Sequence, residues 1–381
     1  MSALSGGTSR RKFLGVVGAG AVPLALSRVG RGDESAPAAE VPWLAEVQRE
    51  PEKKPKQPVE LSPLLVDAAG QPLKTREAWQ VRRGEIRRAW LDFLGEMKGE
   101  APRPRLEVIQ EDPPFIPPLI RGGMGGCVRQ RVRYETEPGL AVEGYLLKPD
   151  KLTGRRPGVV ALHSTVNFTI RQPAGLEGEP GLFFGLQLAR RGCVAFCPTC
   201  FLWVGEGSYD DKVLRFQKRH PGCKGMAKML WDAMRAVDVL ASLEEVDPKR
   251  LGAVGHSLGG KEALYLAAFD ERIKAAVSSE GGIGTTFSNW DAPWYLGKDV
   301  AAKTFRREHH ELLALAAPRA FLLVGGESAD GDSSWPFIQA ALPVYRLYGE
   351  PCRLGLLNHA KGHCVPPEVE ERIHEWLTTY L

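Results

Sequence analysis

The chain has 381 residues, of which 43% are apolar and 25% are charged. It is long enough to bury a large core but too short for many domains. Its 50 basic and 46 acidic residues give a formal net charge of +4. This balance argues against a nucleic-acid-binding protein, and no RNA- or DNA-binding motif is present. Seven irregularly spaced cysteines predict neither a disulfide scaffold nor a zinc site, although one disulfide remains open.

The N-terminus resembles an export signal. Arg10 and Arg11 precede an apolar stretch from Gly15 to Leu26, which is too short to anchor the chain in a membrane. A pair of arginines before such a stretch is typical of a twin-arginine signal, although an incidental basic tail is the alternative. We therefore expect residues 1–39 to be a signal peptide and linker, and the mature protein to be periplasmic or secreted. No other segment reaches transmembrane length, so we expect no membrane span in the mature protein.

Residues 40–126 are expected to form an N-terminal helical extension. A stretch up to about residue 60 mixes Pro, Glu and Lys, which predicts a solvated linker. The segment from Thr75 to Met97 then sets apolar side chains against arginines. This pattern predicts an amphipathic helix that packs on the main domain through some of Trp79, Val81, Ile86, Trp90, Phe93 and Leu94.

Residues 127–381 alternate between predicted strands and helices. Segments 128–135 and 142–147 predict an antiparallel hairpin that leads into a sheet of buried strands. A predicted helix over 225–243 separates two of these strands. Such alternation favours the α/β class, with a mostly parallel central sheet and helices on both faces. The buried strands are expected near 158–162, 193–196, 250–254, 273–279, 320–324 and 353–358.

The sequence over residues 255–259 is Gly-His-Ser-Leu-Gly, between a predicted strand and a predicted helix. This is the pattern of a nucleophile elbow, in which Ser257 occupies a strained turn at the carboxyl end of the sheet. Glycine is needed at 255 and 259 because a Cβ there would collide with the neighbouring strand or helix. The alternative is a glycine-rich turn without a catalytic role.

A serine nucleophile needs a base, and two histidines follow the last predicted strand. His363 lies in a loop between a glycine and two prolines, where its imidazole can reach over a serine at a strand end. We therefore predict His363 as the base. His359, one residue past the strand, is interpreted as a hydrogen-bonded structural histidine.

Three carboxylates compete for the role of the acid that orients the base. Asp330 and Asp332 lie in the loop after the predicted strand at 320–324, and Asp330 is our first choice because it is closer to the strand end. Asp332 is nearly as good, although it could instead cap a helix or a turn. Glu280 follows the preceding strand and is kept as a second reserve.

Two backbone amides are predicted to form the oxyanion hole. One is the N–H of Leu258, directly after the nucleophile, and the other is an N–H near Thr165, in the loop after the strand at 158–162. His163 is expected to brace that loop and to have no role in proton transfer.

Three further residues are predicted to contact substrate. Trp290 and Trp294 belong to an aromatic segment interrupted by proline, which suggests a substrate rim because flat rings stack on sugar faces. Lys261 lies one helical turn beyond the serine, within reach of a sugar hydroxyl or a uronate oxygen. Packing roles for the tryptophans, and a bridge from Lys261 to a nearby carboxylate, remain open.

The order Ser257, Asp330, His363 on alternating strands and helices resembles the α/β-hydrolase superfamily, over about residues 130–381. The two segments Gly-His-Ser-Leu-Gly-Gly-Lys and Val-Ser-Ser-Glu-Gly-Gly resemble the dienelactone-hydrolase-like, acetylxylan-esterase-like and glucuronoyl-esterase-like carbohydrate esterases. Glucuronoyl esterases carry a lysine four residues after the serine, as Lys261 is here, and some place the acid where Glu280 falls. They have arginine directly after the nucleophile, where this chain has Leu258.

The resemblance implies an exported serine carboxylesterase that acts on a small-molecule or polysaccharide ester through an acyl-enzyme. The mechanism requires no metal or organic cofactor. Two alternatives are a non-catalytic binding protein with a hydrolase fold and a serine peptidase of the same fold. The sequence leaves the identity of the ester and the oligomeric state open.

Overall fold

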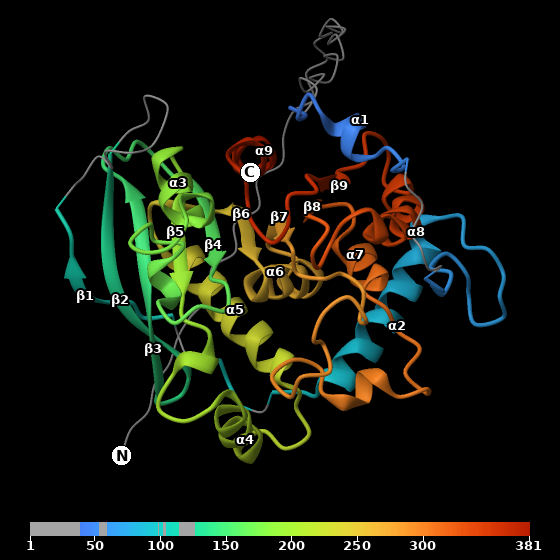
Figure 1. Ribbon diagram of the computed structural model, residues 1–381, viewed down its shortest axis with the longest axis horizontal. Helices are drawn as coiled ribbons and strands as arrows, with labels where there is room; N and C mark the ends of the chain where they lie inside the picture. The colour runs from blue at the N-terminus through green and yellow to red at the C-terminus, as the bar shows by residue number, and fades with distance from the viewer. Residues whose placement is uncertain (1–38, 53–58, 98, 102–103, 114–125) are drawn as a thin grey trace, which may run out of the picture. The chain divides into compact units, whose positions relative to one another are not determined.

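A nine-stranded sheet runs through the computed structural model, which describes residues 39–52, 59–97, 99–101, 104–113 and 126–381 (Figure 1). The strand order is β1-β2-β3-β5-β4-β6-β7-β8-β9. The expected export signal lies outside the described residues. In the described ranges, no helix has the length and apolar composition needed to cross a membrane.

The six strands from β5 to the β9 edge pair in parallel. Their buried side chains follow one another without alternation, because helices cover both faces of a parallel sheet. In β8, for example, every residue is buried. These strands confirm the predicted parallel sheet: β4 (Arg156–Leu162), β5 (Val194–Pro198), β6 (Val246–His256), β7 (Ile273–Ser279), β8 (Ala320–Gly325) and β9 (Leu354–Asn358).

Three antiparallel strands extend the sheet at the other edge. β2 (Cys127–Glu137) and β3 (Leu140–Pro149) form the predicted hairpin, and β3 pairs with β5. The edge strand β1 (Glu107–Glu111) was not expected, since its segment was predicted to belong to a helical extension. All five of its residues are exposed, so its sequence lacks the alternation of apolar and polar residues that marks a half-buried strand.

Helices cover both faces of the sheet, as predicted, and enclose two separate hydrophobic cores. One core lies under α1 (Leu44–Val47), α3 (Phe184–Arg190) and α9 (Pro367–Tyr380). The other lies under the remaining helices, α2 (Arg76–Leu94), α4 (Tyr209–Arg219), α5 (Gly225–Ser242), α6 (Leu258–Phe269), α7 (His310–Ala316) and α8 (Trp335–Arg346). All seven cysteines lie in the described ranges, and none forms a disulfide.

Helix α2 confirms the amphipathic helix predicted near the N-terminus. Thr75 caps it by accepting a hydrogen bond from the backbone N–H of Ala78. Its buried face contains Trp79, Ile86, Trp90 and Leu94 and packs against α7. The indole N–H of Trp90 also donates to Glu311 of α7 at 2.6 Å, so the helix is fixed by a polar contact as well as by burial.

We predict that the buried apolar face of α2 contributes much more to stability than its exposed apolar side chains do. Ile86 is 1% exposed, whereas Val81 on the same helix is 67% exposed. Ile86→Ala should lower the free energy of unfolding by about 2–5 kcal/mol because it leaves a cavity. The control Val81→Ala should change it by no more than about 0.5 kcal/mol. Urea denaturation of both variants measures the difference, and equal effects would contradict the packing of α2 on the main domain.

Candidate active site

Ser257 occupies a strained turn between β6 and α6. Its φ of 59° and ψ of −116° are a conformation that costs a residue other than glycine about 1–3 kcal/mol. A Cβ on Gly255 would lie 2.2 Å from the backbone of Gly259, and one on Gly259 would lie 2.4 Å from the carbonyl oxygen of Leu162. The predicted strand, strained serine and helix are therefore all present, and both flanking glycines are required sterically.

His363 is hydrogen-bonded to Glu280. Nδ1 of the imidazole lies 3.0 Å from Oε2 of Glu280, whose side chain is fully buried, while the His363 side chain is 44% exposed. Glu280 directly follows β7, the strand paired with β6 beside Ser257. The carboxylate fixes the Nδ1–H tautomer, so Nε2 is left without a proton and can act as a base.

The carboxylate of Glu280 is held in its charged form. Burial acts to raise its pKa, but hydrogen bonds from His363 and from the backbone N–H groups of Ala329 and Gly326 outweigh burial and hold the pKa below its ordinary value. Glu280 itself adopts a φ of 50°, so two residues with left-handed backbone, Ser257 and Glu280, follow adjacent strands. Strain of this kind is a common feature of functional sites.

Our first choice of acid, Asp330, does not contact His363 in the structure. Its carboxylate accepts hydrogen bonds from the backbone N–H groups of Gly282 (2.6 Å) and Ile283 (2.7 Å) and from the hydroxyl of Ser334 (2.8 Å). Asp330 is 1% exposed, and burial raises its pKa. The correction has a physical reason: the carboxylate is fully used in holding the loop that follows Glu280.

Asp332 also has a different role from the one we considered. It accepts a hydrogen bond from the side-chain amide of Asn358 at 2.7 Å, and the same amide donates to Glu327 at 2.6 Å. Asn358 ends β9, and the loop that carries His363 begins after it. Asp332 therefore ties the His363 loop to the loop after β8.

Each candidate acid holds the other's loop, an arrangement that we call the Glu280–Asp330 clasp. The carboxylate of Glu280 accepts from Gly326 and Ala329 after β8, and Asp330 accepts from Gly282 and Ile283 after β7. The clasp joins the ends of two neighbouring strands and leaves one Glu280 oxygen facing His363.

Lys261 and Trp290, which we predicted to contact substrate, are both buried beside this clasp, and a direct contact with substrate stays a prediction. Lys261 is 3% exposed, donates to the carbonyl of Gly281, and lies 4.2 Å from the ring centroid of Trp290. Burial lowers its pKa to about 7. Trp290 is fully buried and donates to the carbonyl of Gly282 at 2.7 Å. Both side chains therefore hold the loop after Glu280.

The two predicted oxyanion donors follow the ends of the adjacent strands β6 and β4. Leu258 is the first residue of α6, so its N–H has no acceptor within the helix. Thr165 is exposed in the loop after β4, which pairs with β6 up to Gly255. His163 braces that loop as expected: its Nδ1 donates to the carbonyl of Ser164 at 2.7 Å, and its Nε2 accepts from the N–H of Cys200 at 3.1 Å.

Sequence reasoning missed His256, which supports the candidate base. Its ring centroid lies 4.6 Å from that of His363, and its Nδ1 lies 3.0 Å from the hydroxyl of Ser279. Burial, helped by the neighbouring His363, lowers the pKa of His256 to about 3. The His256 ring that packs against His363 is therefore neutral. It does not repel the positive charge that His363 would carry after it takes a proton. The sequence signal that could have identified His256 is its position directly before the nucleophile Ser257.

Trp294 remains a candidate for a substrate rim because it is only partly buried. Its ring lies 5.5 Å from that of Tyr209, and Tyr209 lies 5.1 Å from Trp203. The ring centroid of Trp203 in turn lies 4.9 Å from that of His163. Three partly buried rings therefore form an aromatic row that ends at the predicted oxyanion loop. We predicted neither Trp203 nor Tyr209, because they lie far from the other site residues in the sequence.

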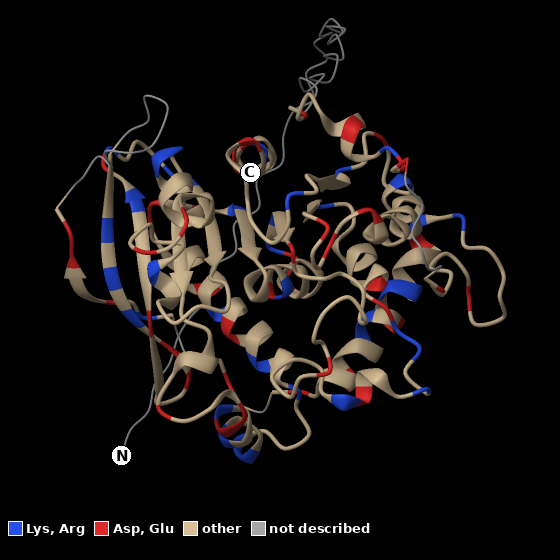
Figure 2. Ribbon diagram, in the orientation of Figure 1, with Lys and Arg blue, Asp and Glu red and all other residues tan. Residues whose placement is uncertain are grey.

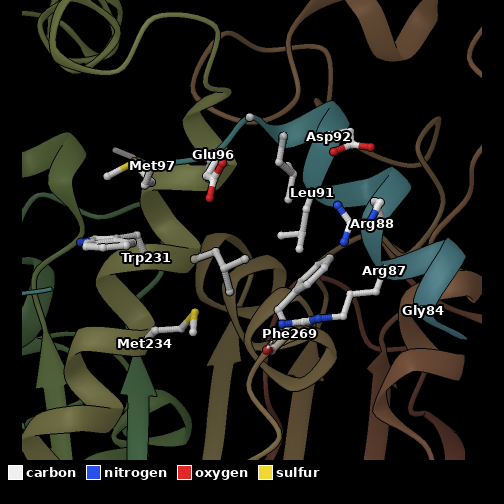
Figure 3. Close-up of a pocket in the computed structure, with 14 residues that line it drawn as sticks. Gly84, Arg87, Arg88, Leu91, Asp92, Glu96, Met97, Trp231, Met234 and Phe269 are labelled. Atoms are coloured by element: carbon white, nitrogen blue, oxygen red, sulfur yellow. Dashed lines mark hydrogen bonds between the residues drawn. The ribbon is translucent and has the colours of Figure 1, made fainter. Parts of the chain in front are cut away.

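One pocket lies apart from these residues. It has a volume of about 820 Å³ and lies between α2 and α5, where Leu91 and Phe269 face Trp231 and Met234 (Figure 3). Phe269 ends α6, about 18 Å along the helix from its start beside Ser257. In the described part of the chain, no cluster of His, Cys, Asp or Glu could hold a metal ion.

Comparison with known proteins identifies carbohydrate esterases as relatives. A sequence profile described as fungal glucuronyl esterase matches residues 216–302. A 4-O-methyl-glucuronoyl methylesterase from Neurospora crassa is 26% identical over 186 residues, which is 40% of this chain and 45% of that protein. The chain thus spans less than half the length of this curated relative. An uncharacterized peptidase from Bacillus subtilis is 25% identical over 43% of this chain and 22% of its own length.

Solved structures confirm the fold. A glucuronoyl esterase from Solibacter usitatus superposes with a TM-score of 0.68 at 20% identity, covering 85% of this chain and 98% of that one. The predicted α/β-hydrolase fold and the predicted resemblance to carbohydrate esterases are therefore both confirmed.

We predict that Glu280, and not Asp330, orients His363. Glu280→Gln should slow labelling of Ser257 by a fluorophosphonate by up to about 10⁴-fold, because the amide no longer fixes the tautomer of the base. Asp330→Asn should slow labelling less, while it lowers the free energy of unfolding by about 1–3 kcal/mol through a lost acceptor for a buried N–H. Labelling kinetics and urea denaturation measure both effects. A larger loss of labelling in Asp330→Asn would return Asp330 to the role of acid.

Proposed function

We propose that this α/β-hydrolase, which resembles carbohydrate esterases, is a serine carboxylesterase with Ser257 as nucleophile, His363 as base and Glu280 as acid. The observation that carries the proposal is the hydrogen bond between His363 and the buried Glu280, on the strand next to the strained serine. These are the parts that acyl transfer through a serine requires.

The reaction follows from these positions. Nε2 of His363 takes the proton of Ser257 as the hydroxyl attacks the ester carbonyl, and Glu280 stabilises the imidazolium that forms. The N–H groups of Leu258 and Thr165 are proposed to bind the oxyanion of the tetrahedral intermediate. His363 then gives its proton to the leaving alcohol, and water hydrolyses the acyl-enzyme by the same steps in reverse order.

The substrate class is proposed from the relatives and from the aromatic row. Relatives whose names specify a glucuronoyl ester favour a uronic acid ester over an acetyl ester on a polysaccharide. Trp294, with Tyr209 and Trp203 beside it, offers partly exposed rings on which a sugar or an aromatic alcohol can stack. Lys261 and Trp290 support this site from below by holding the loop that carries Glu280.

We also propose that the protein is exported. Residues 1–39 would then be a twin-arginine signal and linker, followed by the extension at 40–126 and the hydrolase domain at 127–381. A folded core on both faces of the sheet is consistent with this route, because twin-arginine export carries folded proteins. Replacing Arg10 and Arg11 with lysines should retain the full-length precursor in the cytoplasm.

A peptidase is the second candidate because one relative is described as a peptidase. The sequence match to a glucuronoyl methylesterase covers 45% of that protein, against 22% of the peptidase, so the esterase is favoured. A non-catalytic binding protein is tested separately, because only an activated serine reacts with a fluorophosphonate.

We predict that ester hydrolysis depends wholly on Ser257. The wild-type protein should hydrolyse a short-chain p-nitrophenyl ester and be labelled by a fluorophosphonate at Ser257. Ser257→Ala should lose both, leaving no more than the roughly 10³–10⁴-fold acceleration that binding and an oxyanion hole give alone. Its thermal unfolding should remain that of a folded protein. Turnover retained in Ser257→Ala would contradict the proposed nucleophile.

We predict that a benzyl glucuronate ester has a higher kcat/KM than acetylated xylan or a simple aryl acetate. A peptide p-nitroanilide in the same assay tests the second candidate function, that of a peptidase. Activity on aryl esters alone would leave an esterase without carbohydrate specificity, whereas cleavage of the anilide alone would replace the proposed function.

A further inference from the structure

A second pocket, of about 350 Å³, lies between the tip of the β2–β3 hairpin and helix α4. Four cationic side chains line it, and Glu206 supplies the single carboxylate in its lining. The cations are Lys212, Arg215, Arg219 and Lys228. We call it the α4 pocket. Figure 2 shows basic residues gathered on α4 at the lower edge of the view.

Three of these cations share one face of α4. Lys212, Arg215 and Arg219 are spaced by three and four residues, which brings side chains to the same side of a helix. Arg219 and Lys228 are paired with Glu137, at 3.2 and 2.8 Å. Their charge is thus largely compensated.

Lys212 and Arg215 differ from these two. Neither forms an ion pair with any described carboxylate, and Arg215 donates instead to the backbone carbonyl of Glu206. Nearby Asp211 accepts hydrogen bonds from the N–H and the hydroxyl of Ser208 in the capping box of α4. These hydrogen bonds, with a smaller contribution from the charges of Arg215 and Lys212, hold the pKa of Asp211 below its ordinary value, so its carboxylate partly offsets the two cations. Neither cation is therefore in an ion pair with a carboxylate of the described residues, which leaves both able to pair with an anionic ligand.

The rest of the lining suits a sugar ring. Leu140, Val142 and Val204 provide small apolar surfaces. Thr136 also lines the pocket, but it is buried and its hydroxyl accepts from Lys228 at 3.3 Å. The volume lies at the lower end of the range for small-molecule sites, which fits a single pyranose residue better than a long ligand. Small apolar surfaces beside a few charged groups are a combination that suits a sugar carrying an acid group.

The α4 pocket is connected to the candidate active site by the aromatic row. The ammonium of Lys212 lies 5.9 Å from the ring centroid of Tyr209, and Tyr209 contacts both Trp203 and Trp294. Trp203 contacts His163 at the predicted oxyanion loop. The aromatic row therefore runs from the predicted oxyanion loop to Lys212 in the lining of the α4 pocket.

We propose that the α4 pocket is an accessory site that binds one unesterified uronic acid residue of an acidic polysaccharide, with Lys212 and Arg215 paired to its carboxylate. The placement along a substrate polymer rests on the proposed function, but the binding itself does not. The nucleophile would act on a neutral ester, whereas this pocket would recognise the free acid. The larger pocket between α2 and α5 does not favour an anionic ligand in this way. Its lining contains two basic residues, Arg87 and Arg88, and two acidic residues, Asp92 and Glu96, so the formal charges are equal in number.

Calorimetric titration of the wild-type chain tests the proposal with two matched probes. These are a xylo-oligosaccharide that carries one free glucuronic acid branch and the neutral xylo-oligosaccharide of the same backbone length. We expect the acidic probe to bind at least tenfold more tightly, and this preference to weaken as salt screens the exposed charges. The double variant Lys212→Gln/Arg215→Gln should lose the preference. If the double variant does not fold, the single variant Arg215→Gln, at an exposed position, takes its place in the titration and should weaken the preference.

Lys218 provides the matched control because it lies on the same helix, is exposed, and does not line the pocket. Lys218→Gln should keep wild-type affinity for the acidic probe. Equal binding of the two probes, an equal loss in Lys218→Gln, or an acid preference that survives the Lys212 and Arg215 changes would each overturn the proposal. Ester hydrolysis by the wild type is assayed separately, so a failure of the proposed function would show there and not in the titration.

Discussion

The geometry of the candidate site depends on the Glu280–Asp330 clasp. Glu280 follows β7, and Asp330 lies in the loop after β8. Each carboxylate accepts hydrogen bonds from backbone N–H groups in the loop that follows the other strand. Buried amides need acceptors, so neither loop can move away without leaving several of them unpaired, at about 1–3 kcal/mol each. This constraint fixes Glu280 in a left-handed backbone conformation with one oxygen turned to His363.

Side chains from several elements reinforce the clasp from below. The three carbonyls that follow Glu280, at Gly281, Gly282 and Ile283, accept from Lys261, Trp290 and His309 respectively. His309 also stacks at 5.4 Å on Trp90 of α2. Helix α2 thus contributes to the base of the site through His309, although it precedes the sheet strands in the sequence. The polar groups of this loop are paired inside the core, which suits a rigid support for a catalytic acid.

Much of the fold was predictable from local sequence signals. Continuous apolar runs predicted β4 to β9, and the glycines around Ser257 predicted the elbow because each excludes a Cβ for a nearby backbone contact. The choice between Asp330 and Glu280 was not predictable, because both lie at strand ends and only the direction of each side chain decides which one meets His363. The burial of Lys261 was not predictable for a similar reason: its position after the serine was clear, but its contact with Trp290 depends on a distant segment. The strand β1 gave no signal because all its residues are exposed.

The central claim is that the buried carboxylate of Glu280 holds the proton on Nδ1 of His363. Proton NMR of the wild type with a boronate or phosphonate adduct on Ser257 tests it directly. The claim predicts a strongly downfield resonance from the Nδ1 proton of a charged imidazole, retained in Asp330→Asn and absent in Glu280→Gln. A resonance that survives in Glu280→Gln and disappears in Asp330→Asn would contradict the account.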